Sequence, residues 1–178
     1  MKSPEPKIGR IKPIMEDYSR EDLLEMAFDS YIASTSLVML TKLLIDAVGK
    51  RKAGKLITKA RYAPVYAEAR ALAESMGNPQ DLDSLVETFR IKSPPWVTLV
   101  EFVYRTPNKA IIRSCNHCWE ADAVKKLADK EMQLFLAKHW CVHDEAWVKG
   151  FNPKVEFEQP KHFLRGDDHC EFTLTLPG

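Results

Sequence analysis

Cysteine and histidine, which supply nucleophiles, proton carriers and soft metal ligands, are confined to one part of this sequence. All four cysteines and all five histidines lie between Cys115 and Cys170. Clustering of this kind favours a functional site in the C-terminal half of the chain. The alternative is that the cysteines are small apolar residues of the core, because free cysteine is often buried.

A first motif, Cys115-Asn-His-Cys118, lies where a β-rich segment gives way to a helical one. The amides at a helix N-terminus and the helix dipole lower the pKa of a nearby thiol. The position therefore favours a thiolate at one of the two cysteines. An equally good interpretation is that Cys115 closes a strand that faces the core.

A second motif, His139-Trp-Cys141-Val-His143-Asp144, lies in a segment that we predict to be helical. His139 and His143 are four residues apart and would share a face of that helix. Cys141 belongs to an apolar stripe, and Asp144 lies three residues further on, on the same side. A carboxylate beside a core-facing thiol is costly unless polar groups receive it. The motif therefore predicts a buried polar site; the alternative is an exposed Asp144 at the rim.

Together the two motifs offer a ligand set in zinc-finger order, namely Cys115, Cys118, His139 and His143. The gap between Cys118 and His139 spans residues 119–138, which is longer than the roughly 12–15 residues usual for that motif. The residues in the gap also have a helical pattern, and the sequence has no second Cys-x-x-Cys. We therefore favour no metal or cofactor, and keep zinc bound by these four residues as the alternative.

A third motif, residues 164–172, combines a turn with the start of a strand. Gly166 permits a positive φ, and Asp167 can accept hydrogen bonds from the amides of the turn. Cys170 then points inward. Arg165 could present its fork of donors to the carboxylate of a ligand; the alternative is an ordinary surface arginine.

The elements that position these motifs follow from the spacing of apolar residues. Helical patterns cover about 23–48, 52–76, 82–89, 117–129 and 131–149, and strand patterns cover 96–104, 109–115, 155–158 and 170–176. We expect Pro64 to bend or interrupt the second helix. The order predicts an α+β fold, in which N-terminal helices precede a small antiparallel sheet of about four strands with helices packed on one face.

For the domain organisation, we predict an extended N-terminal arm over residues 1–17, which are rich in proline and charge. Residues 18–178 would form a single α+β domain. Its helical part would cover 18–92, and the sheet-containing part with the candidate site would cover 93–178.

Composition excludes several classes of protein. Lys and Arg number 26 against 25 Asp and Glu, which gives a net charge of +1 and argues against dedicated nucleic-acid binding. The most apolar stretch, residues 31–48, contains Lys42 and Asp46, so we predict a buried helix and no membrane span. Because no secretory signal is recognisable, we expect a cytoplasmic protein. Residues 37–44 are apolar on more than one side, which is typical of a homodimer interface or of deep burial.

Several of these residues resemble a known family. The pattern consists of Cys115 at a strand-to-helix junction, Cys141 with Asp144 in a helix, Asn152-Pro153, and Gly166-Asp167 with Cys170-Glu-Phe172 in the last strand. It is similar to the L-2-amino-thiazoline-4-carboxylic acid hydrolase-like family. The final Gly–Cys–Phe element also resembles the vinyl reductase type of small-molecule-binding domain. The resemblance covers roughly the C-terminal half, and Cys118 with the two helical histidines stands outside it.

The resemblance implies a hydrolase that opens a small cyclic amidine-like ring at a carbon between nitrogen and sulfur. Such a reaction needs a water or thiolate to attack and an acid to protonate the leaving group. On this basis Cys141 or Cys115 would be the nucleophile, and Asp144 would act in acid–base chemistry or in orientation. Substrate contacts would come from Cys170, Arg165, Asn152 and His143, with Arg165 on the substrate carboxylate. The alternatives are a non-catalytic small-molecule-binding domain and a zinc-stabilised sensor or interaction domain.

Overall fold

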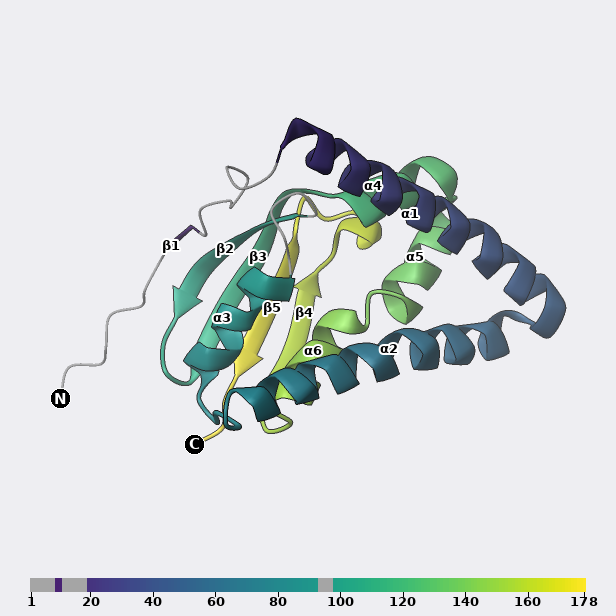
Figure 1. Cartoon of the computed structure of the whole chain (residues 1–178). Helices are drawn as coiled ribbons and strands as arrows, with labels where there is room; N and C mark the ends of the chain where they lie inside the picture. Colours follow the sequence, from purple (N-terminus) through teal and green to yellow (C-terminus); the bar gives the residue numbers. More distant parts are fainter. Residues whose placement is uncertain (1–8, 11–18, 93–97) are drawn as a thin grey trace.

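The computed structural model describes residues 9–10, 19–92 and 98–178, and the description below refers to these residues. Their helices pack on one face of an antiparallel sheet (Figure 1), so the predicted α+β class is confirmed. The arm predicted for residues 1–17 lies outside the described residues, apart from Gly9 and Arg10. The division of the chain into domains stays a prediction.

Two long helices form the N-terminal part, as the apolar spacing predicts. They are α1 (Arg20–Val48) and α2 (Lys50–Ser75), and they meet at Gly49, far from the sheet (Figure 1). Gly49 has a φ of 78°, a left-handed conformation that glycine adopts readily. Pro64 does not interrupt α2. Its ring removes a single helical hydrogen bond, and α2 is also held by packing on α6 (His143–Phe151). None of the helices that the described residues form combines the length and apolarity of a membrane span.

The sheet has the strand order β1-β2-β3-β5-β4, and every neighbouring pair is antiparallel. The predicted hairpin consists of β2 (Thr98–Arg105) and β3 (Lys109–Cys118). The C-terminal strands are β4 (Glu156–Lys161) and β5 (Cys170–Thr175), and the edge strand β1 (Gly9–Arg10) is only two residues long. Alternate residues of β5, beginning with its first, are buried, which agrees with the predicted inward face of the last strand.

β3 is longer than the sequence predicts. It runs through Cys118, and α4 (Trp119–Leu127) follows directly. Cys118, and not Cys115, is therefore the residue at the junction of strand and helix.

The single helix predicted over residues 131–149 is wrong. Two helices occupy this segment, α5 (Lys130–His139) and α6 (His143–Phe151). At the break, the Cys141 amide donates to the Leu136 carbonyl at 3.2 Å, five residues back instead of the four of an α-helix. His139 and His143 consequently lie on different helices and do not share a face.

Close packing fixes α6 against its neighbours. A Cβ atom added to Gly150 would lie 2.4 Å from the Tyr66 carbonyl oxygen of α2, so the two backbones approach closely at this point. From the same helix, Trp147 donates its Nε1–H to Thr88 Oγ1 of α3 (Leu82–Lys92) at 2.7 Å. These contacts hold the helix that carries Asp144.

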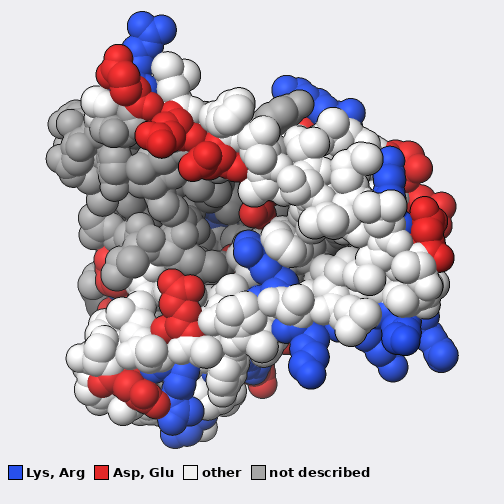
Figure 2. All heavy atoms as spheres, turned by 45° about the vertical axis from the view of Figure 1, so that its right-hand side comes forward, with Lys and Arg blue, Asp and Glu red and all other residues white. Residues whose placement is uncertain are grey.

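On the face of the molecule drawn in Figure 2, acidic and basic side chains both occur.

Candidate functional site

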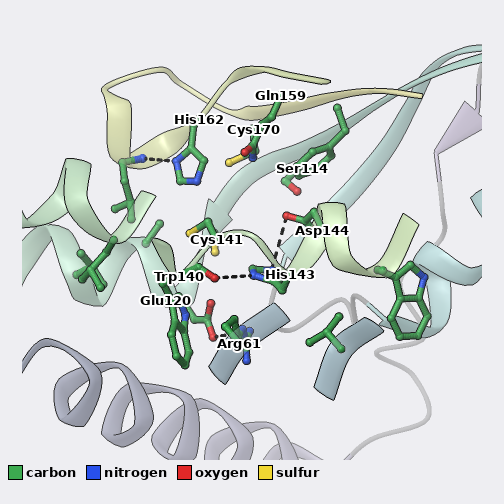
Figure 3. A pocket seen from close by; sticks show the side chains of 18 of the residues that line it. Arg61, Ser114, Glu120, Trp140, Cys141, His143, Asp144, Gln159, His162 and Cys170 are labelled. Carbon is green, nitrogen blue, oxygen red and sulfur yellow. Dashed lines mark hydrogen bonds and ion pairs between the residues drawn. The ribbon is translucent and has the colours of Figure 1, made fainter. Parts of the chain in front are cut away.

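A cavity of about 340 Å³ lies between the sheet and the helices. Three cysteines from separate elements line it: Cys118 from the end of β3, Cys141 from the turn between α5 and α6, and Cys170 from the start of β5. Asp144 from the first turn of α6 lines it as well, and Figure 3 shows Cys141, Asp144 and Cys170 around one space. The structure therefore brings together Cys141, Asp144 and Cys170, which the sequence analysis singled out, and adds Cys118.

The thiols of the cavity are held in their protonated form. Burial raises the pKa of Cys118 and of Cys170 to about 12. Burial first, and the charge of Glu120 second, raise the pKa of Cys141 well above its usual range. Because the thiolate is the nucleophilic form of cysteine, these sulfurs are weak nucleophiles.

Asp144 presents a carboxylate to the cavity, which Glu68 of α2 and Glu120 of α4 also line. Only 9% of the residue is exposed, and the neighbouring His143 places its Nε2 at 3.7 Å from the carboxylate Oδ2. The other ring nitrogen of His143 lies 3.5 Å from the Trp140 carbonyl. The imidazole thus lies between the Asp144 carboxylate and the Trp140 carbonyl at the cavity wall (Figure 3).

His162 is a further ionisable group of the cavity, and the sequence analysis missed it. It is 3% exposed, and its Nδ1 accepts a hydrogen bond from the Leu164 amide at 3.0 Å. Nδ1 therefore carries no proton, and the proton of the neutral ring is on Nε2. Burial first, and the Arg165 charge second, lower the pKa of His162 to about 4. At neutral pH this side chain is an uncharged hydrogen-bond donor.

Charged side chains from α2 and α4 also line the cavity. Arg61 lies with its Cζ 4.4 Å from the centre of the Trp140 ring. Its Nη2 is 3.7 Å from Oε1 of Glu120, and all three side chains line the cavity. No sequence signal marked Arg61, because it is one of many basic residues in α2 and lies far from the cysteines in the chain.

Two residues that we expected to contact a substrate lie elsewhere. Arg165 is exposed, donates to the Gln159 carbonyl and borders a neighbouring groove. Asn152 is fully buried at the end of α6, where its amide donates to the Gln80 carbonyl at 3.1 Å and its oxygen accepts from the Lys154 amide at 3.1 Å. Neither side chain lines the cavity.

The zinc alternative gains no support from the described residues. His139 bonds to Thr58 Oγ1 at 3.0 Å and packs on the Phe135 ring, away from the cavity. The side chain of Cys115 lies outside the described part of the structure. Within the described part, no three His, Cys, Asp or Glu side chains are grouped as metal ligands.

The fold and the cavity define a class of protein: an α+β domain with a cavity between sheet and helices. Within this class, residues 30–174 match the model of the L-2-amino-thiazoline-4-carboxylic acid hydrolase family, and the chain belongs to that family. The resemblance noted in the sequence is thereby confirmed.

A solved structure supports the fold assignment. The phenol-responsive sensory domain of the transcription activator PoxR, crystallised with phenol, is similar to this chain with a TM-score of 0.54 and 15% identity. The match covers 80% of this chain and 74% of the other. At this identity the likeness concerns the fold alone. No curated protein matches this chain.

Proposed function

We propose that this protein is a hydrolase that opens the ring of a small cyclic amidine of the 2-amino-thiazoline carboxylate type, within the cavity at Asp144. The observation that carries the proposal is the position of a buried carboxylate beside neutral thiols and an uncharged imidazole, all around one small cavity. Membership of the family supports this class of substrate.

Asp144 supplies the charge that an amidine requires. Coulomb attraction and hydrogen bonds to a charged group are stronger where water is excluded. One carboxylate oxygen accepts a hydrogen bond from the exocyclic amino group of the ring. The neutral thiols of Cys118, Cys141 and Cys170 form polarisable walls that suit a sulfur-containing ring.

The proposed reaction is a hydrolysis without a further reactant. The second oxygen of Asp144 takes a proton from a water molecule as the water oxygen bonds to the carbon between nitrogen and sulfur. The carbon–sulfur bond then breaks, and the ring sulfur leaves with the proton that Asp144 holds. The added hydroxyl becomes the carbonyl of a urea and releases its proton to solvent, so that the product is an open-chain urea with a free thiol. His162 donates its Nε2–H to the negative charge that develops during the step.

Water is favoured over Cys141 as the nucleophile. The raised pKa of Cys141 leaves little thiolate at neutral pH. A nucleophilic cysteine normally lies beside a positive charge that lowers its pKa, whereas the charged neighbours that act on Cys141 are acidic. The sequence-based role of Asp144 in acid–base chemistry is retained.

The test is the appearance of a free thiol when the protein is incubated with L-2-amino-thiazoline-4-carboxylate. We expect Asp144→Asn to lower the rate by about 10²-fold or more, since general-base catalysis contributes on that order. Cys141→Ser should keep most of the rate. Full activity of Asp144→Asn would refute the proposal, and a complete loss in Cys141→Ser would restore the thiol as nucleophile. Thermal unfolding of each variant controls for misfolding.

A second candidate function is binding without catalysis. Apolar side chains of Phe89, Trp147 and Phe172 also line the cavity, and such surfaces hold ligands without reacting with them. In this case the ring compound would bind and would be recovered unchanged.

Two expectations from the sequence remain proposals, namely a homodimer and a cytoplasmic location. Exposed apolar side chains of α1, including Leu24, Phe28 and Leu43, favour the homodimer.

A further inference from the structure

We propose that Arg61 and Trp140 form a subsite for the carboxylate of the ligand, so that the cavity selects molecules with a carboxylate at one end and an amidine at the other. The amidine end rests on the proposed function; the carboxylate end rests on separate observations. From the sequence we expected Arg165 to bind the substrate carboxylate, but Arg165 borders the neighbouring groove.

Unsatisfied donors mark the subsite. Among the described side chains, three buried nitrogen atoms have no hydrogen-bond acceptor: Arg61 Nε, Trp140 Nε1 and His169 Nε2. Two of the three belong to residues that line the cavity and pack on each other. Buried donors in proteins are almost always paired. Two neighbouring exceptions at one cavity indicate that an acceptor is missing, and that a ligand provides it.

The arrangement of Arg61 fits a carboxylate. The Trp140 ring holds the guanidinium through a cation–π contact, with 4.4 Å between Cζ and the ring centre. Glu120 lies 3.7 Å from Nη2, which is too far for a hydrogen bond. Glu120 therefore offsets part of the charge but leaves Nε–H without an acceptor. An arginine fork with free donors is the preferred partner of a carboxylate.

Arg61 differs from Arg165 in lining the cavity itself, whereas Arg165 borders the neighbouring groove that shares Cys141 and His162 with it. Among the described residues that line the cavity, Arg61 is the one arginine, and none is a lysine. Arg61 Nε and Trp140 Nε1 are both buried from solvent. The carboxylate must therefore enter with a small shift of the Arg61 and Glu120 side chains, and the loose contact between these two permits it.

The two ends together define the ligand class. Asp144 offers a negative charge to a cationic amidine, and Arg61 offers a positive charge to a carboxylate. Both line one cavity of about 340 Å³, which limits the ligand to a small molecule. Compounds that carry only one of the two groups leave a buried charge unpaired and bind more weakly.

The test compares two pairs of probes by calorimetry. The first pair is L-2-amino-thiazoline-4-carboxylate and 2-amino-thiazoline, which lacks the carboxylate. The second pair, benzoate and benzamide, contains no amidine. In the native protein we expect each carboxylate to bind about tenfold or more tightly than its counterpart without the carboxylate, as expected for a hydrogen bond to a charged group. Arg61→Gln should abolish this preference without weakening the binding of 2-amino-thiazoline.

Two conservative variants keep the proposal testable if Arg61→Gln does not fold. Trp140→Phe preserves an aromatic platform and removes the indole N–H, so it should reduce the preference for the carboxylate in part. Arg61→Lys preserves the charge and removes the fork, with the same direction of effect. Glu120→Gln is the matched control: it removes a negative charge beside the subsite and should tighten the carboxylate probes only.

The outcomes separate this inference from the proposed function. If probes with and without the carboxylate bind equally, and Arg61→Gln does not change this, the carboxylate subsite is overturned while the amidine site at Asp144 stands. Binding of benzoate that depends on Arg61, without binding of either thiazoline, supports the subsite and overturns the proposed substrate. Binding of neither carboxylate overturns the subsite.

Discussion

Replacing Gly150 with alanine should destabilise the protein through the contact between α6 and α2. The new Cβ would lie 2.4 Å from the backbone oxygen of Tyr66 and 3.0 Å from the Cβ of Ala69. A backbone oxygen inside a long helix cannot move aside cheaply, and overpacking of this kind costs about 1–3 kcal/mol, occasionally more. Helix propensity returns at most about 1 kcal/mol to the variant. The φ of Gly150 is not positive, so the cost is one of space alone.

We therefore expect a net loss of about 1–2 kcal/mol for Gly150→Ala, which corresponds to a fall in Tm of about 2–8 °C for a chain of this size. Urea and thermal unfolding measure it. Gly54→Ala is the control, because its Cβ meets a side chain, the His139 ring, at 2.7 Å; it should lose less stability. A Gly150→Ala variant as stable as the native protein would refute the packing of α6 on α2 that positions Asp144.

Three further predictions concern groups around the cavity. The pKa of His162 is about 4 in the folded protein and about 6.5 in the unfolded chain. Stability is therefore at its full value above pH 6.5, and about 3 kcal/mol of it is lost as the pH falls toward 4. Urea unfolding at pH 7 and pH 5 should therefore show a decrease that His162→Asn makes shallower, and an unchanged slope would contradict the buried neutral ring. Glu120→Gln should lower the pKa of Cys141, because the negative charge of Glu120 is, after burial, the second cause of the raised pKa of that thiol. The variant should then react faster with iodoacetamide at mildly alkaline pH, and an unaltered rate counts against the prediction. Thr88→Val should cost about 1–3 kcal/mol by leaving the Trp147 Nε1–H without its acceptor, whereas Thr88→Ser should keep most of the stability; equal stabilities of the two variants would disprove the role of that hydrogen bond.

The elements with a regular apolar period could be predicted from the sequence. The helices on either side of Gly49 were found because apolar residues recur at helical spacing and glycine adopts the positive φ needed between them. The inward face of β5 followed from strict alternation beginning at Cys170. Cysteine and histidine clustering also directed attention to the half of the chain that contains Cys141 and Asp144.

What could not be predicted depends on contacts between distant segments. The break after His139 arises because the Leu136 carbonyl accepts the amides of both Trp140 and Cys141, and no residue type in this segment announces it. Arg61 reaches the cavity only because α2 packs against α5 and α6. Nothing about its local sequence separates Arg61 from the other basic residues of α2, so it could not be chosen over Arg165 from sequence alone.

The central claim is that one cavity holds the ligand, with its amidine at Asp144 and its carboxylate at Arg61. A crystal structure of the Asp144→Asn variant soaked with L-2-amino-thiazoline-4-carboxylate tests it most directly. We predict that the ring lies among Cys118, Cys141 and Cys170, with its amino group at residue 144 and its carboxylate toward Arg61. An empty cavity at saturating ligand, or a ligand bound at any other place on the protein, would contradict the account.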